Sequence, residues 1–301
     1  MFLHADRATE AARFSSSGLD LALHDLAAKA LRIPVYGLLG VCRREKVLAG
    51  IEVPRGTPEQ MAEHSLEYFQ QGIWGIRAKI GADPVRDAEC IQAICQFCPP
   101  MIYVGTAELA NRDRLGDGIS LRADAHRGYA LSEAKMFCKL VEASAAGLEL
   151  LEQPLREHDL EGLRELRIAT SLPIEVDESA YSMSTVHLIL KHDAADVINT
   201  KCTKAGGIKG VKEWAAVTEA AHRRVVIGAE RGTGLKVAAK LHLGAAIGNA
   251  DPVVEFTEIM IHELLLKEPL PLVDRYLRVP SGPGLGLELD DDQIERYRAP
   301  A

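Results

Sequence analysis

Three short apolar runs in this sequence each end abruptly in an acidic residue. They occupy 119–123 before Asp124, 148–151 before Glu152, and 174–176 before Asp177. The segments between consecutive runs carry apolar residues at helical spacing. Buried parallel strands that alternate with helices and stop at acids are typical of an α/β barrel, which presents its functional side chains at the carboxyl ends of the strands. Three carboxylates at successive strand ends would form a hard oxygen site, which suits Mg²⁺.

The composition is that of an ordinary soluble globular protein. The chain has 301 residues, of which 47% are hydrophobic and 26% charged, so a single barrel can bury a large core. The formal net charge of −8 argues against nucleic acid or an anionic membrane as a partner, because neither would attract an acidic surface. No apolar run is long enough to cross a bilayer, and the N-terminus lacks the apolar stretch of a signal peptide. A cytoplasmic location is therefore expected.

The rest of the chain repeats the alternation of strand and helix. Strands are expected at 47–53, 74–80, 119–124, 148–151, 174–177, 197–201, 225–229 and 253–256. Helices are expected between them at 57–71, 84–97, 132–146, 159–169, 182–191, 211–224 and 235–247, with one more at 18–31 before the first strand. This order predicts an α/β fold, a TIM-type (β/α)7β barrel. The irregular segment 99–118 exceeds the usual connection and is expected to be an insertion, either a surface loop or part of a lid.

Nearly every strand end in this scheme carries an ionisable residue. These residues are, in order from strand 2 to strand 7, Lys79, Asp124, Glu152, Asp177, Lys201 and Glu230. Strands 2 and 6 lie across the mouth of an eight-stranded barrel, so the two lysines are expected to face each other, with the three carboxylates on the arc between them. This arrangement suits abstraction of a proton α to a carboxylate, because a divalent ion bound to the substrate would stabilise the enolate.

A lysine that acts as a base must be neutral. Arg77 lies two residues before Lys79 and hence on the same side of the strand. Its fixed charge, together with a nearby metal ion, is expected to lower the pKa of Lys79. A single acid at a strand end is often only a helix cap, and a single lysine is usually a solvated charge. The combination of three acids and two lysines is what favours a functional site.

The sequence resembles the muconate lactonising and mandelate racemase branch of the enolase superfamily over nearly its whole length. The similar segments, in the order of the family, are LDLALHDLAAKALRIPVYGLLG at 19–40, RAK at 77–79, ADA at 123–125, LEQP at 151–154, VDES at 176–179, NTKCTKAGGI at 199–208, KLHLGAA at 240–246 and VPSGPGLGLELD at 279–290. The resemblance implies that Asp124, Glu152 and Asp177 bind Mg²⁺, with Mn²⁺ as an alternative. It also implies that Lys79 and Lys201 form the acid/base pair.

The same resemblance implies a small carboxylate substrate and an enolate intermediate. Members with a lysine pair include cycloisomerases, amino-acid racemases, dipeptide epimerases and dehydratases, and family members are often homo-oligomers. Racemisation or epimerisation of an amino-acid derivative is the preferred expectation, since opposed lysines allow proton exchange on both faces of the carbon. Muconate-type cycloisomerisation and dehydration of a hydroxyproline or sugar acid are the alternatives. The stretch 228–235 lacks the Asp-x-Asp pair usual in dipeptide epimerases, which disfavours dipeptides.

The sequence departs from the family pattern in three places. Arg77 replaces the first lysine of the usual K-x-K pair, and His126 replaces an asparagine, either as a supporting group of the site or as an ordinary loop residue. The chain also begins close to the last helices of the family's N-terminal capping domain. We therefore expect a remnant of that capping region at 1–45, the barrel at 46–256 and a C-terminal tail at 257–301 that packs back on the barrel or cap. A barrel without a full cap could also be catalytically inert and serve in assembly.

Three further residues are expected to support the site. Glu178 and Glu230 would hold a lysine or a ligand in place. Lys204 and the glycines at 206–207 lie just beyond strand 6. These glycines either form a turn, which is preferred, or receive a substrate carboxylate.

Overall fold

The computed structural model describes residues 3–98, 119–230, 232–260 and 264–298. The insertion expected at 99–118 lies outside the described residues. Over the described ranges, no helix is both long enough and apolar enough to cross a membrane.

Eight parallel strands form the centre of the molecule. They are β1 (Lys46–Val53), β2 (Gly75–Lys79), β3 (Ser120–Asp124), β4 (Leu151–Glu152), β5 (Ile174–Val176), β6 (Val197–Thr200), β7 (Arg224–Ile227) and β8 (Val253–Glu255). Consecutive strands pair from β1 to β7, and β8 pairs with β1. The ring closes between β7 and the start of β8, where Val225 bridges to Ala250 and the Asp251 N–H donates to the Val225 carbonyl at 2.8 Å. The predicted TIM-type barrel is confirmed.

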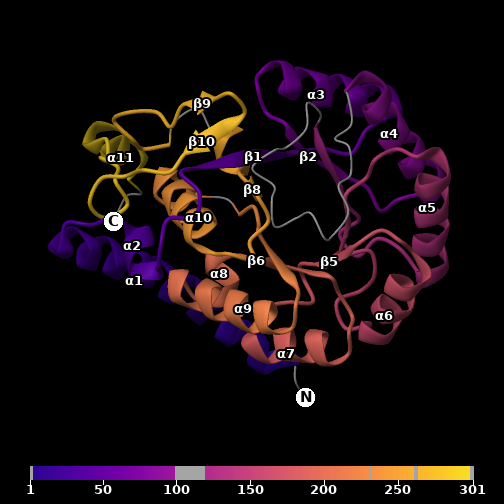
Figure 1. The fold of residues 1–301 in the computed structure, drawn as a ribbon, viewed down its shortest axis with the longest axis horizontal. Helices are drawn as coiled ribbons and strands as arrows, with labels where there is room; N and C mark the ends of the chain where they lie inside the picture. The colour runs from indigo at the N-terminus through magenta and orange to yellow at the C-terminus, as the bar shows by residue number, and fades with distance from the viewer. Residues whose placement is uncertain (1–2, 99–118, 231, 261–263, 299–301) are drawn as a thin grey trace.

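Helices cover the outside of the ring (Figure 1). Those that connect successive strands are α3 (Pro58–Gln70), α4 (Pro84–Phe97), α5 (Leu131–Ser144), α6 (Leu160–Ala169), α7 (Met183–Lys191), α9 (Ile208–Ala220) and α10 (Gly234–Ala246). Several begin at a polar cap: Thr57 and Gln60 form a capping box at α3, and Asp83 accepts from two N–H groups of α4. A short extra helix, α8 (Cys202–Ala205), follows β6 and was not predicted.

The two ends of the chain pack against the barrel. Helix α1 (Leu3–Leu31) extends well before the predicted start at residue 18 and contacts α2 (Val35–Leu39), α8 and α9. The tail contains η2 (Thr257–Met260), β9 (Leu272–Val273), β10 (Tyr276–Arg278) and α11 (Asp291–Tyr297). Strand β10 pairs antiparallel with β1, with Val47 opposite Leu277, so the tail returns to the barrel sheet.

The ring places the strand ends of distant segments at one mouth. Lys79 is the register partner of Asp124, and Asp124 is the register partner of Glu152. Register partners on parallel strands point to the same face of a sheet. The last residues of β2, β3 and β4 therefore form one level at the mouth of the barrel.

Candidate active site

Asp124 is the acid at the end of β3, and its side chain is almost fully buried. One oxygen accepts from the Lys79 Nζ at 2.6 Å, and the other accepts from the backbone N–H of His126 at 2.9 Å. Burial alone would raise the pKa of Asp124, but Arg77 and Lys79 outweigh it, and the pKa is lowered. Asp124 is thus a carboxylate with two strong donors.

Glu152 ends β4 and is completely buried. Arg77 donates through Nη1 to its two oxygens at 3.0 and 3.3 Å, and the Asn199 amide donates to Oε1 at 3.3 Å. Burial raises the pKa of Glu152 well above its ordinary value, against the opposing charge of Arg77. A buried acid in this position needs further positive charge to remain ionised.

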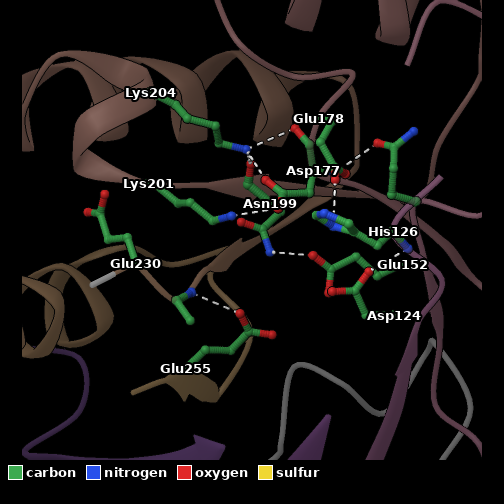
Figure 2. A network of polar contacts seen from close by, with 12 residues as sticks. Asp124, His126, Glu152, Asp177, Glu178, Asn199, Lys201, Lys204, Glu230 and Glu255 are labelled. Carbon is green, nitrogen blue, oxygen red and sulfur yellow. Dashed lines mark hydrogen bonds and ion pairs between the residues drawn. The ribbon is translucent and has the colours of Figure 1, made fainter. Parts of the chain in front are cut away.

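Asp177 follows β5 and accepts from two lysines at once (Figure 2). Lys201 Nζ lies 2.5 Å from Oδ2, and Lys204 Nζ lies 2.5 Å from Oδ1. The Gln153 side chain fixes the same loop by accepting from the Asp177 N–H at 3.0 Å. Burial opposes ionisation, yet the charges of Lys204 and Lys201 hold the pKa of Asp177 far below its ordinary value.

The two predicted acid/base lysines are paired with two different ligand candidates. Burial and then the charge of Arg77 lower the pKa of Lys79, as expected, but the neighbouring carboxylates, led by Asp124, reverse the net effect and raise it. The pKa of Lys201 is raised in the same way, because Asp177 outweighs burial. In this arrangement the full charge of Asp124 faces the lysine, so Arg77 alone does not lower the Lys79 pKa; the lowering expected from Arg77 together with a metal ion stays a prediction.

The acids of the mouth were tested for their fit to a divalent cation. Within the described ranges, no three carboxylate, histidine or cysteine side chains converge on a point that could hold a metal ion. The three acids instead form ion pairs with lysines and an arginine. The donor chemistry fits, since all three groups offer hard oxygens at adjacent strand ends. The charge of Asp177 acts to raise the pKa of Asp124, and the charge of Asp124 acts to raise the pKa of Glu152, so neighbouring acids repel each other. A cation between them would relieve that repulsion.

Other predicted residues lie around this centre in Figure 2. His126 has a left-handed backbone (φ +48°), and its Nδ1 lies 2.7 Å from Oε1 of Glu178. Glu230 accepts from the Thr203 hydroxyl, and Lys236 Nζ lies 3.5 Å from its Oε2. The glycines at 206 and 207 both have positive φ, +84° and +130°, as the preferred turn requires.

Four acidic or amide residues of the site were not predicted. Asn199 donates to both Glu152 and Glu175, and Glu255 of β8 lies 3.0 Å from Arg77 Nη1. Glu52 of β1 accepts from Arg77 Nη2 at 3.2 Å. The spacing of residues along the strands could have predicted two of them. Asn199 precedes Lys201 by two residues, so both lie on the same face of the strand end. Glu175 precedes Asp177 in the same way.

Comparison with known proteins agrees with this fold. Residues 107–293 match the family model "Enolase C-terminal domain-like", and residues 1–40 match "Mandelate racemase / muconate lactonizing enzyme, N-terminal domain". The chain is 29% identical over 274 residues to L-Ala-D/L-Glu epimerase of Bacillus subtilis, across 91% of this chain and 70% of that relative. It is 31% identical over 299 residues to muconate cycloisomerase 1 of Rhodococcus opacus, across 97% of this chain and 74% of the relative.

A solved structure supports the same assignment. The substrate-liganded L-Ala-D/L-Glu epimerase of Bacillus subtilis superposes with a TM-score of 0.78 at 28% identity, covering 90% of this chain and 71% of that one. The chain belongs to the enolase superfamily, in its mandelate racemase and muconate lactonizing enzyme branch. By this membership it is an enzyme, and its relatives include epimerases, racemases and cycloisomerases.

Proposed function

We propose that this protein is a Mg²⁺-dependent enzyme that removes the α-proton of a small carboxylate substrate and passes through an enolate. The preferred outcome is racemisation or epimerisation of an amino-acid derivative. The observation that carries the proposal is that two lysines, on strands four apart in the ring, each contact one of three buried acids: Lys79 contacts Asp124 and Lys201 contacts Asp177.

In this mechanism Asp124, Glu152 and Asp177 would hold the cation. When bound, Mg²⁺ supplies positive charge that stabilises the carboxylate-derived enolate. Lys79 and Lys201 would carry out the proton transfers, because lysine can lose its proton and arginine cannot. The charges of Asp124 and Asp177 raise both lysine pKa values, and a cation held by these acids would offset those charges. One lysine takes the α-proton and the other returns a proton to the opposite face, which inverts the carbon.

The remaining residues keep those groups in place. Arg77 cannot act as a base, and its contacts with Glu152 and Glu255 place a fixed positive charge beside both buried acids. Lys204 Nζ also donates to the carbonyls of Asp177 and Asn199, at 2.9 and 2.7 Å. These bonds fix the β5 and β6 ends relative to each other, so Lys204 orients Asp177 and leaves Lys201 to exchange protons.

Cycloisomerisation is the second candidate. It is favoured by the 31% identity to a muconate cycloisomerase, whose chemistry also passes through an enolate in the superfamily scheme. Dipeptides return as candidates through the epimerase relative, although the stretch 228–235 lacks the expected Asp-x-Asp pair. The screen must therefore cover all three substrate types.

The first test is a calorimetric titration with Mg²⁺ of the unmodified protein, Asp177→Asn and a control, Asp193→Asn. Asp193 also bridges two basic residues, Arg167 and Arg223, but half of its side chain is exposed on the outside of the barrel. We expect saturable binding that Asp177→Asn abolishes and the control retains. Equal binding by all three proteins would place the cation elsewhere.

The second test is incorporation of deuterium at the α-carbon in D₂O with Mg²⁺. The probes are N-succinyl-L-Arg, L-Ala-L-Glu and cis,cis-muconate, the last followed by loss of absorbance. Exchange or turnover of one probe that Lys79→Met and Lys201→Met both abolish supports the proposal. Metal binding without exchange or turnover of any probe would favour the inert barrel.

A further inference from the structure

The loop after β2 (residues 80–83) and the loop after β3 (residues 125–130) touch through their backbones. Gly81 has a φ of +99°, and a Cβ on it would lie 2.1 Å from the Ala125 carbonyl oxygen. A Cβ on Gly128 would lie 2.0 Å from the Gly81 carbonyl oxygen. No side chain fits at either glycine, so the two loops form one backbone layer beside the mouth.

One buried carboxylate from outside the site holds this layer. Asp87 lies in the first turn of α4, and its Oδ2 accepts from the N–H groups of Gly81, Ala82 and Asp83 at 2.9, 2.9 and 3.1 Å. The same oxygen accepts from the Tyr129 hydroxyl at 2.6 Å. Asp87 thus ties the β2 loop to the β3 loop.

Tyr129 is suited to a permanent donor role. Its side chain is buried, and its ring packs against Phe137 of α5 with centroids 5.8 Å apart. Burial, and then the hydrogen bond to Asp87, raise the pKa of Tyr129 well above its ordinary value. The phenol therefore stays protonated and keeps donating to Asp87.

The two loops begin directly after two residues of the proposed chemistry. Lys79 immediately precedes the β2 loop, and Asp124 immediately precedes the β3 loop. The Ile80 N–H donates to the Asp124 carbonyl at 2.9 Å, which continues the β2–β3 register past the strand ends. The 2.6 Å contact between Lys79 Nζ and Asp124 Oδ2 joins the two residues from which these loops start.

We propose that Asp87 and Tyr129 are positioning residues that lock the β2 and β3 loops together and thereby set Lys79 against Asp124. The inference rests on the proposed function for its catalytic consequence, while the lock itself is a property of the fold. A shift of about 1 Å between reacting groups can lower a rate on the order of 100-fold, so a loosened lock affects turnover more than substrate binding.

The test compares Tyr129→Phe with Ser65→Ala. The first keeps the ring and removes only the hydroxyl that reaches Asp87. The control also removes a buried hydroxyl, which donates to the Met61 carbonyl at 2.7 Å within α3 and touches neither loop. Asp87→Ala, which removes the acceptor of three N–H groups, serves as the stronger variant if it folds.

The first measurement is amide hydrogen exchange by mass spectrometry in EDTA. We expect the amides at 80–83 and 125–130 to exchange about 10-fold faster in Tyr129→Phe than in the unmodified protein, with no change in the control. The second measurement uses α-deuterium exchange of N-succinyl-L-Arg. In Tyr129→Phe, kcat should fall about 10-fold, with KM within about 2-fold of the original value. If the hydroxyl only stabilised the fold, the folded fraction of the variant would keep both kcat and KM.

The two measurements separate the possible failures. If loop exchange in Tyr129→Phe matches the control, the lock does not exist and the inference is overturned. If the loops loosen but kcat is unchanged, the positioning role is overturned. If the unmodified protein exchanges no α-proton at all, the proposed function fails. The Mg²⁺ affinity of Tyr129→Phe is then compared with that of Ser65→Ala: a lower affinity means that the lock positions Asp124, and an equal affinity means that it does not.

Discussion

Two groups of buried charges lie inside this barrel and are built differently. The mouth cluster consists of Arg77, Lys79, Lys201 and Lys204 with Asp124, Glu152, Asp177 and Glu255. The lower cluster consists of Arg122 and Arg224 with Glu149 and Asp251. The mouth cluster lies at the carboxyl ends of the strands, whereas the lower cluster draws mainly on their amino-terminal halves.

The lower cluster is centred on a buried arginine. Arg122 is buried in the middle of β3 and contacts Asp251, while its Nε lies 3.5 Å from Glu149. Asp251 also accepts from Arg224 at 2.9 Å, and Ser120 donates to Glu149 at 2.6 Å. Its cations are arginines, which keep their charge at any ordinary pH.

The mouth cluster is open to solvent and contains lysines. The side chains of Lys79 and Lys201 are 23% and 16% exposed, against 2% for Arg122, while Arg224 at the edge of the lower cluster is 24% exposed. In barrels of this type, residues at the amino-terminal face of the strands serve stability, whereas residues at the carboxyl-terminal face are available for chemistry. Under the proposed function, ion pairs of similar geometry differ in role according to which cation they contain and whether a ligand can reach it.

The largest expected effect is on activity. Lys201→Met should lower kcat for α-proton exchange by about 1,000-fold, equivalent to about 4 kcal/mol, because a positioned acid/base group is lost. Stability should change little, since Asp177 keeps the 2.5 Å contact with Lys204. Steady-state exchange and thermal unfolding measure the two quantities.

The matched control is Lys135→Met, which removes an exposed lysine that pairs with Glu165 at 2.6 Å on the outside of the barrel. It should leave both kcat and unfolding near their original values. A large loss of stability in Lys201→Met, with activity retained by the folded fraction, would erase the distinction between the two clusters.

The second effect is on stability. Asp251→Ala should lower the free energy of unfolding by about 3–5 kcal/mol, because it leaves the buried Arg122 without its main partner. Asp193→Ala is the control: Asp193 also bridges two arginines, yet its side chain is 50% exposed against 1% for Asp251. The control should cost less than about 1 kcal/mol.

Urea unfolding gives both values, and the Mg²⁺ affinity of the folded protein should be the same in the two variants. If Asp251→Ala and Asp193→Ala lowered the free energy of unfolding by similar amounts, burial would not make the ion pairs of the lower cluster more important for stability than a surface ion pair. Loss of Mg²⁺ binding in Asp251→Ala alone would mean that the lower cluster belongs functionally to the mouth.

The sequence predicted the parts of the mouth that are encoded locally. Asp124 and Asp177 could be recognised because each follows a short segment, ISLRA at 119–123 and IEV at 174–176, that alternates along the chain with helical segments. Glu255 could not, because its contact with Arg77 joins β8 to β2 and exists only once the ring has closed. Its position in a strand near the end of the chain carries no local sign of that contact.

Helix boundaries were missed for a different reason. The segment 3–17 is polar and serine-rich, so its extension of α1 has no clear apolar periodicity. Helix α8 spans four residues, too few for a period to be detected. The role of Asp87 was also invisible, because three of its four donors are backbone groups, which leave no pattern in a sequence.

The smallest expected effect concerns Glu175, which lies between the two clusters. It accepts from Asn199 of the mouth at 2.8 Å, and the charge of Arg122 in the lower cluster acts on it. Burial, followed by the charge of Glu255, raises its pKa from 4.5 to about 8. The folded state holds this proton more tightly than the unfolded state. Protonation of Glu175 therefore stabilises the fold, fully below its ordinary pKa of 4.5, and this stabilisation is lost as the pH rises towards about 8.

Glu175→Gln removes that titration while keeping an acceptor for Asn199. Between about pH 5.5 and 7.5, the stability difference between the unmodified protein and the variant should therefore shift in favour of the variant by about 1 kcal/mol per pH unit. Urea unfolding in EDTA at several pH values measures it, and the difference cancels the groups common to both proteins. A difference independent of pH would mean that Glu175 is already ionised and paired with Arg122, so that the two clusters form one continuous network of charges.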